Sequence, residues 1–167
     1  MIKIFNSLLV TMFNLGKIKF IPATFGSFAA AIILFYLFHS LNISTNIILT
    51  SFIIIFFYSF YATSYHIKQS KNNDFSKIII DKALGQSIPI FLYEISHGTT
   101  KENYEAIIYY SIFFILFRYF DIMKPFPVSF FHKNFKNCFG VIMDDLCAGV
   151  YVVLSMVSFM IIKSYIV

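Results

Sequence analysis

Long runs of apolar residues, separated by short polar segments, make up most of this chain. The pattern predicts a first apolar helix over about residues 27–38 and a second over about 47–65, joined by the uncharged segment 40–46. A bilayer core is spanned by about 20 mostly apolar helical residues. We therefore expect the two helices to form a hairpin in a membrane, with 40–46 as its outer turn.

The next apolar segment, residues 78–95, carries polar and helix-breaking residues inside it. Asp81, Lys82, Gly85 and Pro89 interrupt its apolar pattern. Polar groups and Pro are tolerated at membrane depth where neighbouring protein surrounds them. The segment is therefore predicted to be a broken or tilted helix that packs against protein rather than lipid.

Two lysine-bearing segments, 66–77 and 129–140, are predicted to be cytoplasmic loops, because positively charged loops are retained on that side of a membrane. Two crossings must then separate them, and only 78–95 and an apolar helix over about 106–120 are available. With a last helix over about 145–162, the chain crosses the bilayer about five times, or about four times if 78–95 is only re-entrant.

The composition agrees with this pattern and excludes an ordinary soluble domain. Hydrophobic residues make up 59% of the 167 residues and charged residues 13%, and the mean hydropathy is +0.77. No repeat or linker divides the chain, so we expect one all-α, polytopic membrane domain over 1–167. The formal charge of +5 is spread between apolar segments, which favours membrane orientation over nucleic-acid binding. Cys138 and Cys147 have no disulfide or metal-site spacing, and the pattern makes no prediction of oligomeric state.

The stretch RYFDIMKPFPV, residues 118–128, places charges at the end of an apolar helix. Arg118, Asp121 and Lys124 follow one another at three-residue spacing, so a continuing helix would display all three on one face. Pro125 and Pro127 then end the helix. One interpretation is that the basic side chains reach the lipid headgroups and the aspartate only pairs with them. The other is a functional site.

Four of the eight acidic residues favour the functional interpretation, because all lie at the predicted cytoplasmic edges of apolar segments. They are Asp81, Asp121, Asp144 and Asp145. Unpaired carboxylates at such edges cost several kcal/mol and are usually functional. The doubled aspartate at 144–145 is predicted to lie at a helix N-terminus, where one residue caps the helix and the second either complements the dipole or faces a site. Mg²⁺ prefers such oxygen ligands, so with Arg118 and Lys124 nearby the set suggests a metal and phosphate site.

A small-residue turn is predicted at residues 20–28, directly before the first membrane helix. It contains Pro22, Thr24, Gly26 and Ser27. Backbone N–H groups at a helix start can hold an anion. A plain N-capping turn explains the same residues equally well.

Four blocks of the sequence, taken in order, resemble those of the phosphatidylglycerophosphatase A family. They are PATFGS at 22–27, IIIDKALGQ at 78–86, FRYFDIMKPFPV at 117–128 and FGVIMDDLCAG at 139–149. The resemblance covers about residues 16–160. It implies an all-helical, Mg²⁺-dependent lipid phosphatase of the bacterial inner membrane that converts phosphatidylglycerophosphate to phosphatidylglycerol. The lysine-bearing loops predict that its site lies on the cytoplasmic side.

The resemblance also assigns roles to the motif residues. The four aspartates would organise Mg²⁺ and catalysis, Arg118 and Lys124 would hold the phosphate, and Thr24 and Ser27 would add hydrogen-bond donors, while the acyl chains stay in the bilayer. Attack by water and attack by an aspartate remain alternatives.

Three positions depart from the family pattern. Ala23 stands where the family usually has Gly, Phe126 where it has Trp, and Lys82 where it has Glu. Lys82 reverses a charge beside Asp81, which predicts weakened Mg²⁺ binding. A non-enzymatic membrane protein, either a transporter subunit or a relic of the family, is therefore the alternative. A transporter would carry polar groups near mid-membrane, whereas these carboxylates lie at one edge.

Overall fold

The computed structural model of the protein is built from helices. It describes residues 2–17, 21–69, 78–97, 102–135 and 137–166, and within these ranges no strand occurs. The helices are α1 (Ile2–Val10), α2 (Pro22–Phe35), α3 (Thr45–Gln69), α4 (Ile80–His97), α5 (Asn103–Met123), α6 (Val128–Asn134) and α7 (Cys138–Ile166), with a 3₁₀ turn at Leu15–Lys17 and a π-helical turn at Tyr36–Ser40. The predicted all-α fold is confirmed.

Four of these helical segments are long and apolar enough to cross a membrane. They span Pro22–Ser40, Thr45–Lys68, Asn103–Met123 and Cys138–Tyr165. Large apolar side chains on them face outward: Phe57 is 69% exposed and Ile115 65%. Because a bilayer core solvates such side chains and water does not, this surface is that of a membrane protein.

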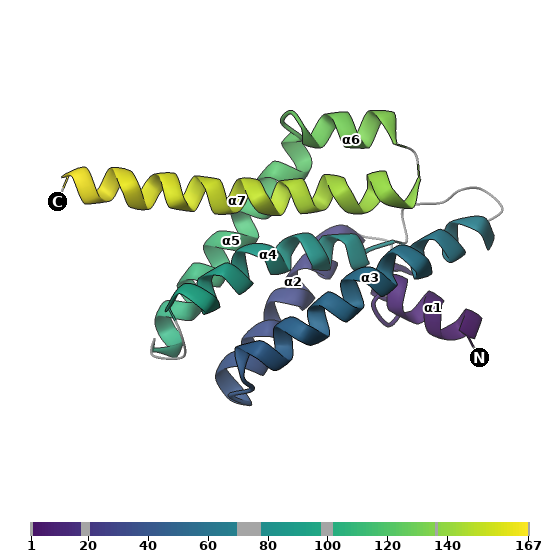
Figure 1. Ribbon diagram of the computed structural model, residues 1–167, viewed down its shortest axis with the longest axis horizontal. Coiled ribbons are helices and arrows are strands. Elements are labelled where there is room, and N and C mark those ends of the chain that lie inside the picture. Colours follow the sequence, from purple (N-terminus) through teal and green to yellow (C-terminus); the bar gives the residue numbers. More distant parts are fainter. Residues whose placement is uncertain (1, 18–20, 70–77, 98–101, 136, 167) are drawn as a thin grey trace.

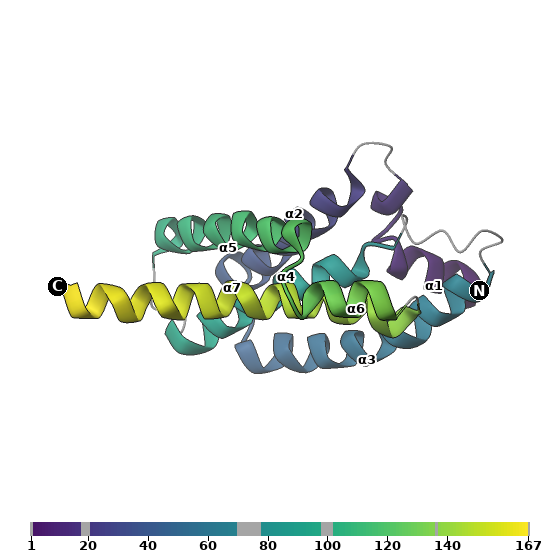
Figure 2. The same cartoon turned by 90° about the horizontal axis from the view of Figure 1, so that it is seen from above.

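The helix α4 lies among the four long apolar helices (Figures 1 and 2), and most of its residues are buried. It packs most extensively against α7 and α2 and also contacts α3 and α5. Ile90 is fully buried and Phe91 is 4% exposed. The predicted packing against protein is therefore confirmed. Of the two predicted alternatives, a broken or a tilted helix, the break is excluded, because α4 continues as one helix through Pro89.

Chain direction alternates from α2 to α3, α4 and α5, and α7 again runs in the direction of α4 (Figures 1 and 2). The ends of α3 and α5 and the starts of α2, α4 and α7 therefore share one side of the bundle. This arrangement is compatible with five crossings, although α4 is not among the four described segments that are long and apolar enough to span a membrane. The part of the predicted 66–77 loop up to Gln69 belongs to α3, and residues 70–77 lie outside the described residues.

Two predicted boundaries are wrong. The first membrane helix begins at Pro22 rather than near Ser27, so Thr24, Gly26 and Ser27 lie in its first turns instead of in a preceding turn. Proline at the first helical position has its φ already fixed for a helix and lacks an N–H that would be unpaired there anyway. The left-handed Ile21 precedes it.

The last helix begins at Cys138 rather than near Asp145, and the expected loop 129–140 contains all of α6 after Val128 and the first residues of α7. Asn137 explains the early start, because its side-chain oxygen accepts a hydrogen bond from the Gly140 N–H at 3.0 Å, as an N-cap does.

Close contact between α4 and α7 depends on two glycines. A Cβ added at Gly85 would lie 2.4 Å from the Asp145 carbonyl oxygen, and one added at Gly149 would lie 2.3 Å from the Gly85 carbonyl oxygen. Only glycine permits backbones to approach so closely at these positions. The contact brings the start of α4 against the Asp145 segment of α7.

Candidate functional site

Lys82 connects two buried carboxylates from different helices. Its Nζ donates to Asp81 Oδ2 at 3.0 Å and to Asp145 Oδ2 at 2.9 Å. The Lys82 side chain is 19% exposed, whereas the Asp81 and Asp145 side chains are 2% and 1% exposed. The Lys82 backbone N–H also donates to Asp81 Oδ1 at 2.8 Å. The lysine thus points inward and links α4 to α7.

Lys124 makes the second link between helices. Its Nζ donates to Asp144 Oδ2 at 3.0 Å, across from the end of α5 to α7. Lys124 is the C-cap of α5 and has a left-handed backbone, with φ 45°. The expected continuous face of three charges is therefore wrong at Lys124, because the helix ends at Met123. The pair of Arg118 and Asp121 within α5 is as expected, with the guanidinium donating to the carboxylate.

The doubled aspartate lies inside α7 rather than at its N-terminus, so the capping interpretation is wrong. Successive helical residues point about 100° apart. Asp144 accordingly reaches Lys124 of α5, and Asp145 reaches Lys82 of α4. Two adjacent carboxylates in one helix thereby fix the positions of two neighbouring helices.

These pairs form one charged cluster. It comprises Asp81, Lys82, Arg118, Asp121, Lys124, Asp144 and Asp145. Asp121 also attracts Lys82 electrostatically, which connects the pair within α5 to the rest. All four predicted catalytic aspartates and both predicted phosphate-binding cations therefore lie at one end of the bundle, as the sequence indicated.

The carboxylates of the charged cluster do not form a metal site in this arrangement. Among the described residues, no three Asp, Glu, His or Cys side chains converge as a ligand set. The space between Asp81 and Asp145 is taken by the Lys82 ammonium. One oxygen, Asp145 Oδ1, is buried without a hydrogen-bond partner. The present oxygen set therefore does not fit Mg²⁺, which requires near-octahedral coordination at about 2.0–2.1 Å.

Thr24 and Ser27 lie on the first turns of α2, which packs against the start of α4. A Cβ added at Gly26 would lie 3.1 Å from Ile79 Cβ. Ser27 is fully buried, and its hydroxyl donates to the carbonyls of Ala23 at 3.1 Å and Thr24 at 3.3 Å. Thr24 is partly exposed. The Ser27 hydroxyl thus serves its own helix, and Thr24 is the better placed of the two to meet a ligand.

A second polar cluster was not foreseen from the sequence. Glu94, 2% exposed, accepts a hydrogen bond from the Tyr110 hydroxyl at 2.9 Å and contacts His39 Nε2 at 3.0 Å. Its three residues come from α4, α5 and the π-helical turn, away from the charged cluster. The sequence feature that could have indicated this cluster is the single glutamate, Glu94, within the apolar run 90–95. Because the Glu94 carboxylate has two partners, the cluster joins α4 to α5 and to the π-helical turn.

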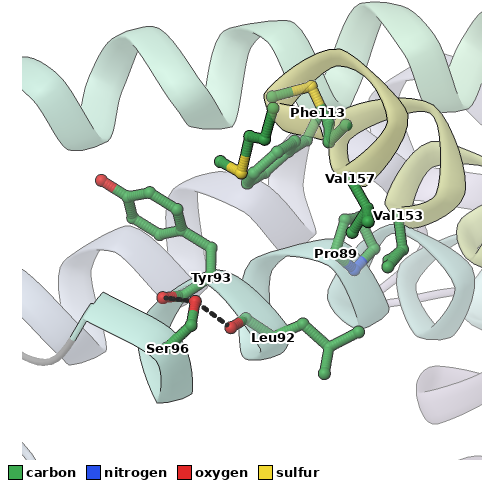
Figure 3. A pocket seen from close by; sticks show the side chains of 9 residues that line it. Pro89, Leu92, Tyr93, Ser96, Phe113, Val153 and Val157 are labelled. Carbon is green, nitrogen blue, oxygen red and sulfur yellow. Dashed lines mark hydrogen bonds between the residues drawn. The ribbon is translucent and has the colours of Figure 1, made fainter. Parts of the chain in front are cut away.

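Two cavities among the described residues have apolar linings. A small one of about 100 Å³ lies between α4, α5 and α7 and is lined by Pro89, Leu92, Phe113 and Val153 (Figure 3). There the Ser96 hydroxyl donates to the backbone carbonyl of Leu92 rather than into the space. A larger groove of about 520 Å³ separates α2 from α5. Neither of these two is lined by a charged residue, so neither adds charged groups to those of the charged cluster.

The protein is an all-helical membrane protein with carboxylates, lysines and an arginine together at one end of its bundle. These are the groups of a membrane enzyme that acts on charged headgroups. Residues 8–160 match the family model described as Phosphatidylglycerophosphatase A. The chain belongs to this family, which confirms the resemblance of the four blocks. It is accordingly a phosphoric monoester hydrolase.

Relatives agree with this assignment. The chain is 29% identical over 147 residues to the phosphatidylglycerophosphatase A of Haemophilus influenzae, covering 88% of this chain and 83% of the relative. It is 31% identical over 145 residues to a Bacteroides thetaiotaomicron protein named provisionally as a phosphatidylinositol-3-phosphatase, covering 86% of each. A 37-residue stretch is 40% identical to the phosphatidylglycerophosphatase A of Escherichia coli, covering 22% of each. No solved structure matches the chain.

Proposed function

We propose that the protein hydrolyses phosphatidylglycerophosphate to phosphatidylglycerol and phosphate, as a step of phospholipid synthesis in a bacterial inner membrane. Family membership supports the reaction class. The observation that carries the proposal is the charged cluster, in which three cations and four carboxylates from α4, α5 and α7 lie together. Lysines at the ends of α3 and α6 support a cytoplasmic location for this end, by the positive-inside rule.

Arg118 and Lys124 are the proposed phosphate-binding residues. Their side chains are 15% and 25% exposed, so both are within reach of a headgroup at the membrane surface. Arginine binds phosphate with two parallel hydrogen bonds, and lysine acts as a point charge. In the structure each cation is held by an aspartate, which orients it before substrate arrives. Thr24 is proposed as a further donor, and Ser27 as support for its helix turn.

The carboxylates are proposed to handle the proton and the nucleophile. In the displacement, an oxygen attacks phosphorus, the bond from phosphorus to the glycerol oxygen breaks, and the leaving oxygen takes up a proton. Asp121 and Asp144 are the more accessible carboxylates, at 11% and 8%, compared with 2% for Asp81 and 1% for Asp145. We assign to this accessible pair either contact with the attacking water, or direct attack followed by hydrolysis of the aspartyl phosphate by water, which releases phosphate. We assign the positioning of α4 against α7 to the buried pair.

The Mg²⁺ requirement implied by the resemblance stays a prediction. Its ligands would be the four aspartates, but the buried pair is occupied by Lys82, and no step above depends on a metal. Assays with Mg²⁺ and with a chelator measure the requirement directly. Activity that persists in the chelator would remove Mg²⁺ from the proposal.

The test uses full-length protein purified in detergent, with phosphate release measured from phosphatidylglycerophosphate. Phosphatidylinositol 3-phosphate serves as the competing substrate because one relative bears that name. We expect Asp121→Asn and Asp145→Asn to abolish turnover, since the amide keeps the shape but loses the charge. Glu102→Gln, at an exposed residue next to α5, is the matched control and should keep full activity. Wild-type turnover in either aspartate variant would remove that residue from the site, and preference for the inositol lipid would overturn the proposed substrate.

A further inference from the structure

We propose that the Lys82 ammonium acts as the protein's own cation between Asp81 and Asp145, and that it keeps divalent metal ions off this carboxylate pair. The proposal rests on the proposed function only in taking this pair as part of the active site. Its geometry and its test concern metal binding and do not depend on turnover.

The position of Lys82 is that of a bridging cation. One Nζ atom lies 3.0 Å from an Asp81 oxygen and 2.9 Å from an Asp145 oxygen. The two aspartates are far apart in sequence and come from α4 and α7. A lysine that only neutralised its neighbour would need just one of these contacts, whereas Lys82 joins two helices as a shared metal ion would.

The charge and burial of the two carboxylates are those of a site for a divalent ion. Two buried carboxylates face a single ammonium, and Asp145 Oδ1 remains buried without any hydrogen-bond donor. Burying a carboxylate oxygen without a partner is costly, so the pair retains capacity for further positive charge. A divalent ion would match both carboxylates and use that free oxygen.

Lysine and metal exclude each other at this position. Oxygen ligands approach a small divalent ion to about 2.0–2.1 Å, and an ammonium within hydrogen-bond distance of the same oxygens occupies that space. The positive charges of the ammonium and of a metal ion would also repel each other strongly at such short distance. A metal can bind the pair only if Lys82 leaves it.

The two possible roles of Lys82, a purely structural ion pair and a substitute for a metal ion, predict different results when the lysine is removed. In the structural case, removing the lysine charge destabilises the protein and metal does not repair it. If Lys82 substitutes for a metal, the vacated pair gains a divalent site and the added ion restores the lost stability.

The experiment measures Mn²⁺ binding to full-length protein in detergent, by the loss of the free-ion electron paramagnetic resonance signal, without any substrate. Lys82→Met removes the charge and keeps the chain length, Lys82→Arg keeps the charge, and Lys68→Met removes an exposed lysine of α3 as the matched control. We expect Lys82→Met to bind Mn²⁺ at least about tenfold more tightly than wild type. Lys82→Arg and Lys68→Met should bind as wild type does.

Thermal unfolding provides the second measurement. Mn²⁺ should raise the Tm of Lys82→Met and leave that of wild type unchanged. Equal Mn²⁺ affinity in Lys82→Met and wild type would overturn the proposal. If Lys82→Met does not fold, the wild-type protein provides the test. Mn²⁺ binding by wild type that is lost in Asp145→Asn would overturn the proposal, and the absence of such binding would support it. Because no substrate is present, an inactive protein with the expected binding pattern would refute the proposed function alone.

Discussion

Replacing Gly85 with alanine tests whether the approach of α4 to α7 sets the geometry of the charged cluster. The new Cβ would lie 2.4 Å from the Asp145 carbonyl oxygen and 2.7 Å from Phe117 Cε2. Phe117 is fully buried, and the carbonyl belongs to the α7 backbone, so neither neighbour can turn aside. The helices must separate to admit one methyl group.

The size of the effect follows from these distances. Ordinary contact begins near 3.4 Å, so the Asp145 backbone must move by about 1 Å. A shift of that size takes the 2.9 Å bond between Lys82 and Asp145 beyond hydrogen-bond range. Overpacking of this kind costs about 1–3 kcal/mol, partly offset by up to about 1 kcal/mol from the better helix propensity of alanine. Misplacing a catalytic group by about 1 Å can lower the rate about 100-fold.

The assay compares phosphate release and thermal unfolding for wild type, Gly85→Ala and a matched control in detergent. Gly26→Ala is the control, because its Cβ would lie 3.1 Å from Ile79 Cβ and the neighbour need yield by only a few tenths of an ångström. We expect Gly85→Ala to lose most of its turnover with a modest fall in Tm, and Gly26→Ala to keep nearly all of both. Wild-type turnover in Gly85→Ala would refute the reasoning that this contact positions the cluster.

Two further predictions concern topology and stability. In a background without native cysteines, Lys68→Cys and Phe126→Cys should be labelled by an impermeant reagent from the same side of the membrane, and Ser44→Cys from the other; labelling of Lys68→Cys and Phe126→Cys from opposite sides would contradict the shared site. Tyr110→Phe should lower the free energy of unfolding by about 1–3 kcal/mol, because it leaves the buried Glu94 carboxylate one donor short, while kcat stays unchanged. A changed kcat would show that this cluster reaches the chemistry.

The apolar helices could be predicted from the sequence because bilayer-facing segments are long and continuous. Their ends were less accurate, because capping is decided by single residues. Pro22 starts α2 and Asn137 caps α7, whereas the prediction weighted the later Ser27 and Asp145. The charges of Asp144 and Asp145 suggested a helix end, but partners on other helices allow both residues to lie inside α7.

The membership of the charged cluster was predictable, and its pairing was not. Arg118 and Asp121 lie three residues apart on one helix, so their contact follows from local spacing. The partner of Lys124 depends on the left-handed end of α5, and that of Lys82 depends on how α7 crosses α4. Such contacts between helices cannot be derived from the spacing along one segment taken by itself.

One regularity in the sequence does encode the crossing. Asp81 and Gly85 are four residues apart in α4, and Asp145 and Gly149 are four residues apart in α7. Residues at this spacing lie on the same helix face, one turn apart. Each helix thus presents a glycine that lets the backbones touch and, one turn earlier, an aspartate that the contact brings toward its counterpart. Because the two glycines bring the helices together, Asp81 and Asp145 come close enough for one lysine to bridge both. The glycines of these two blocks are therefore as necessary to the charged cluster as the aspartates themselves.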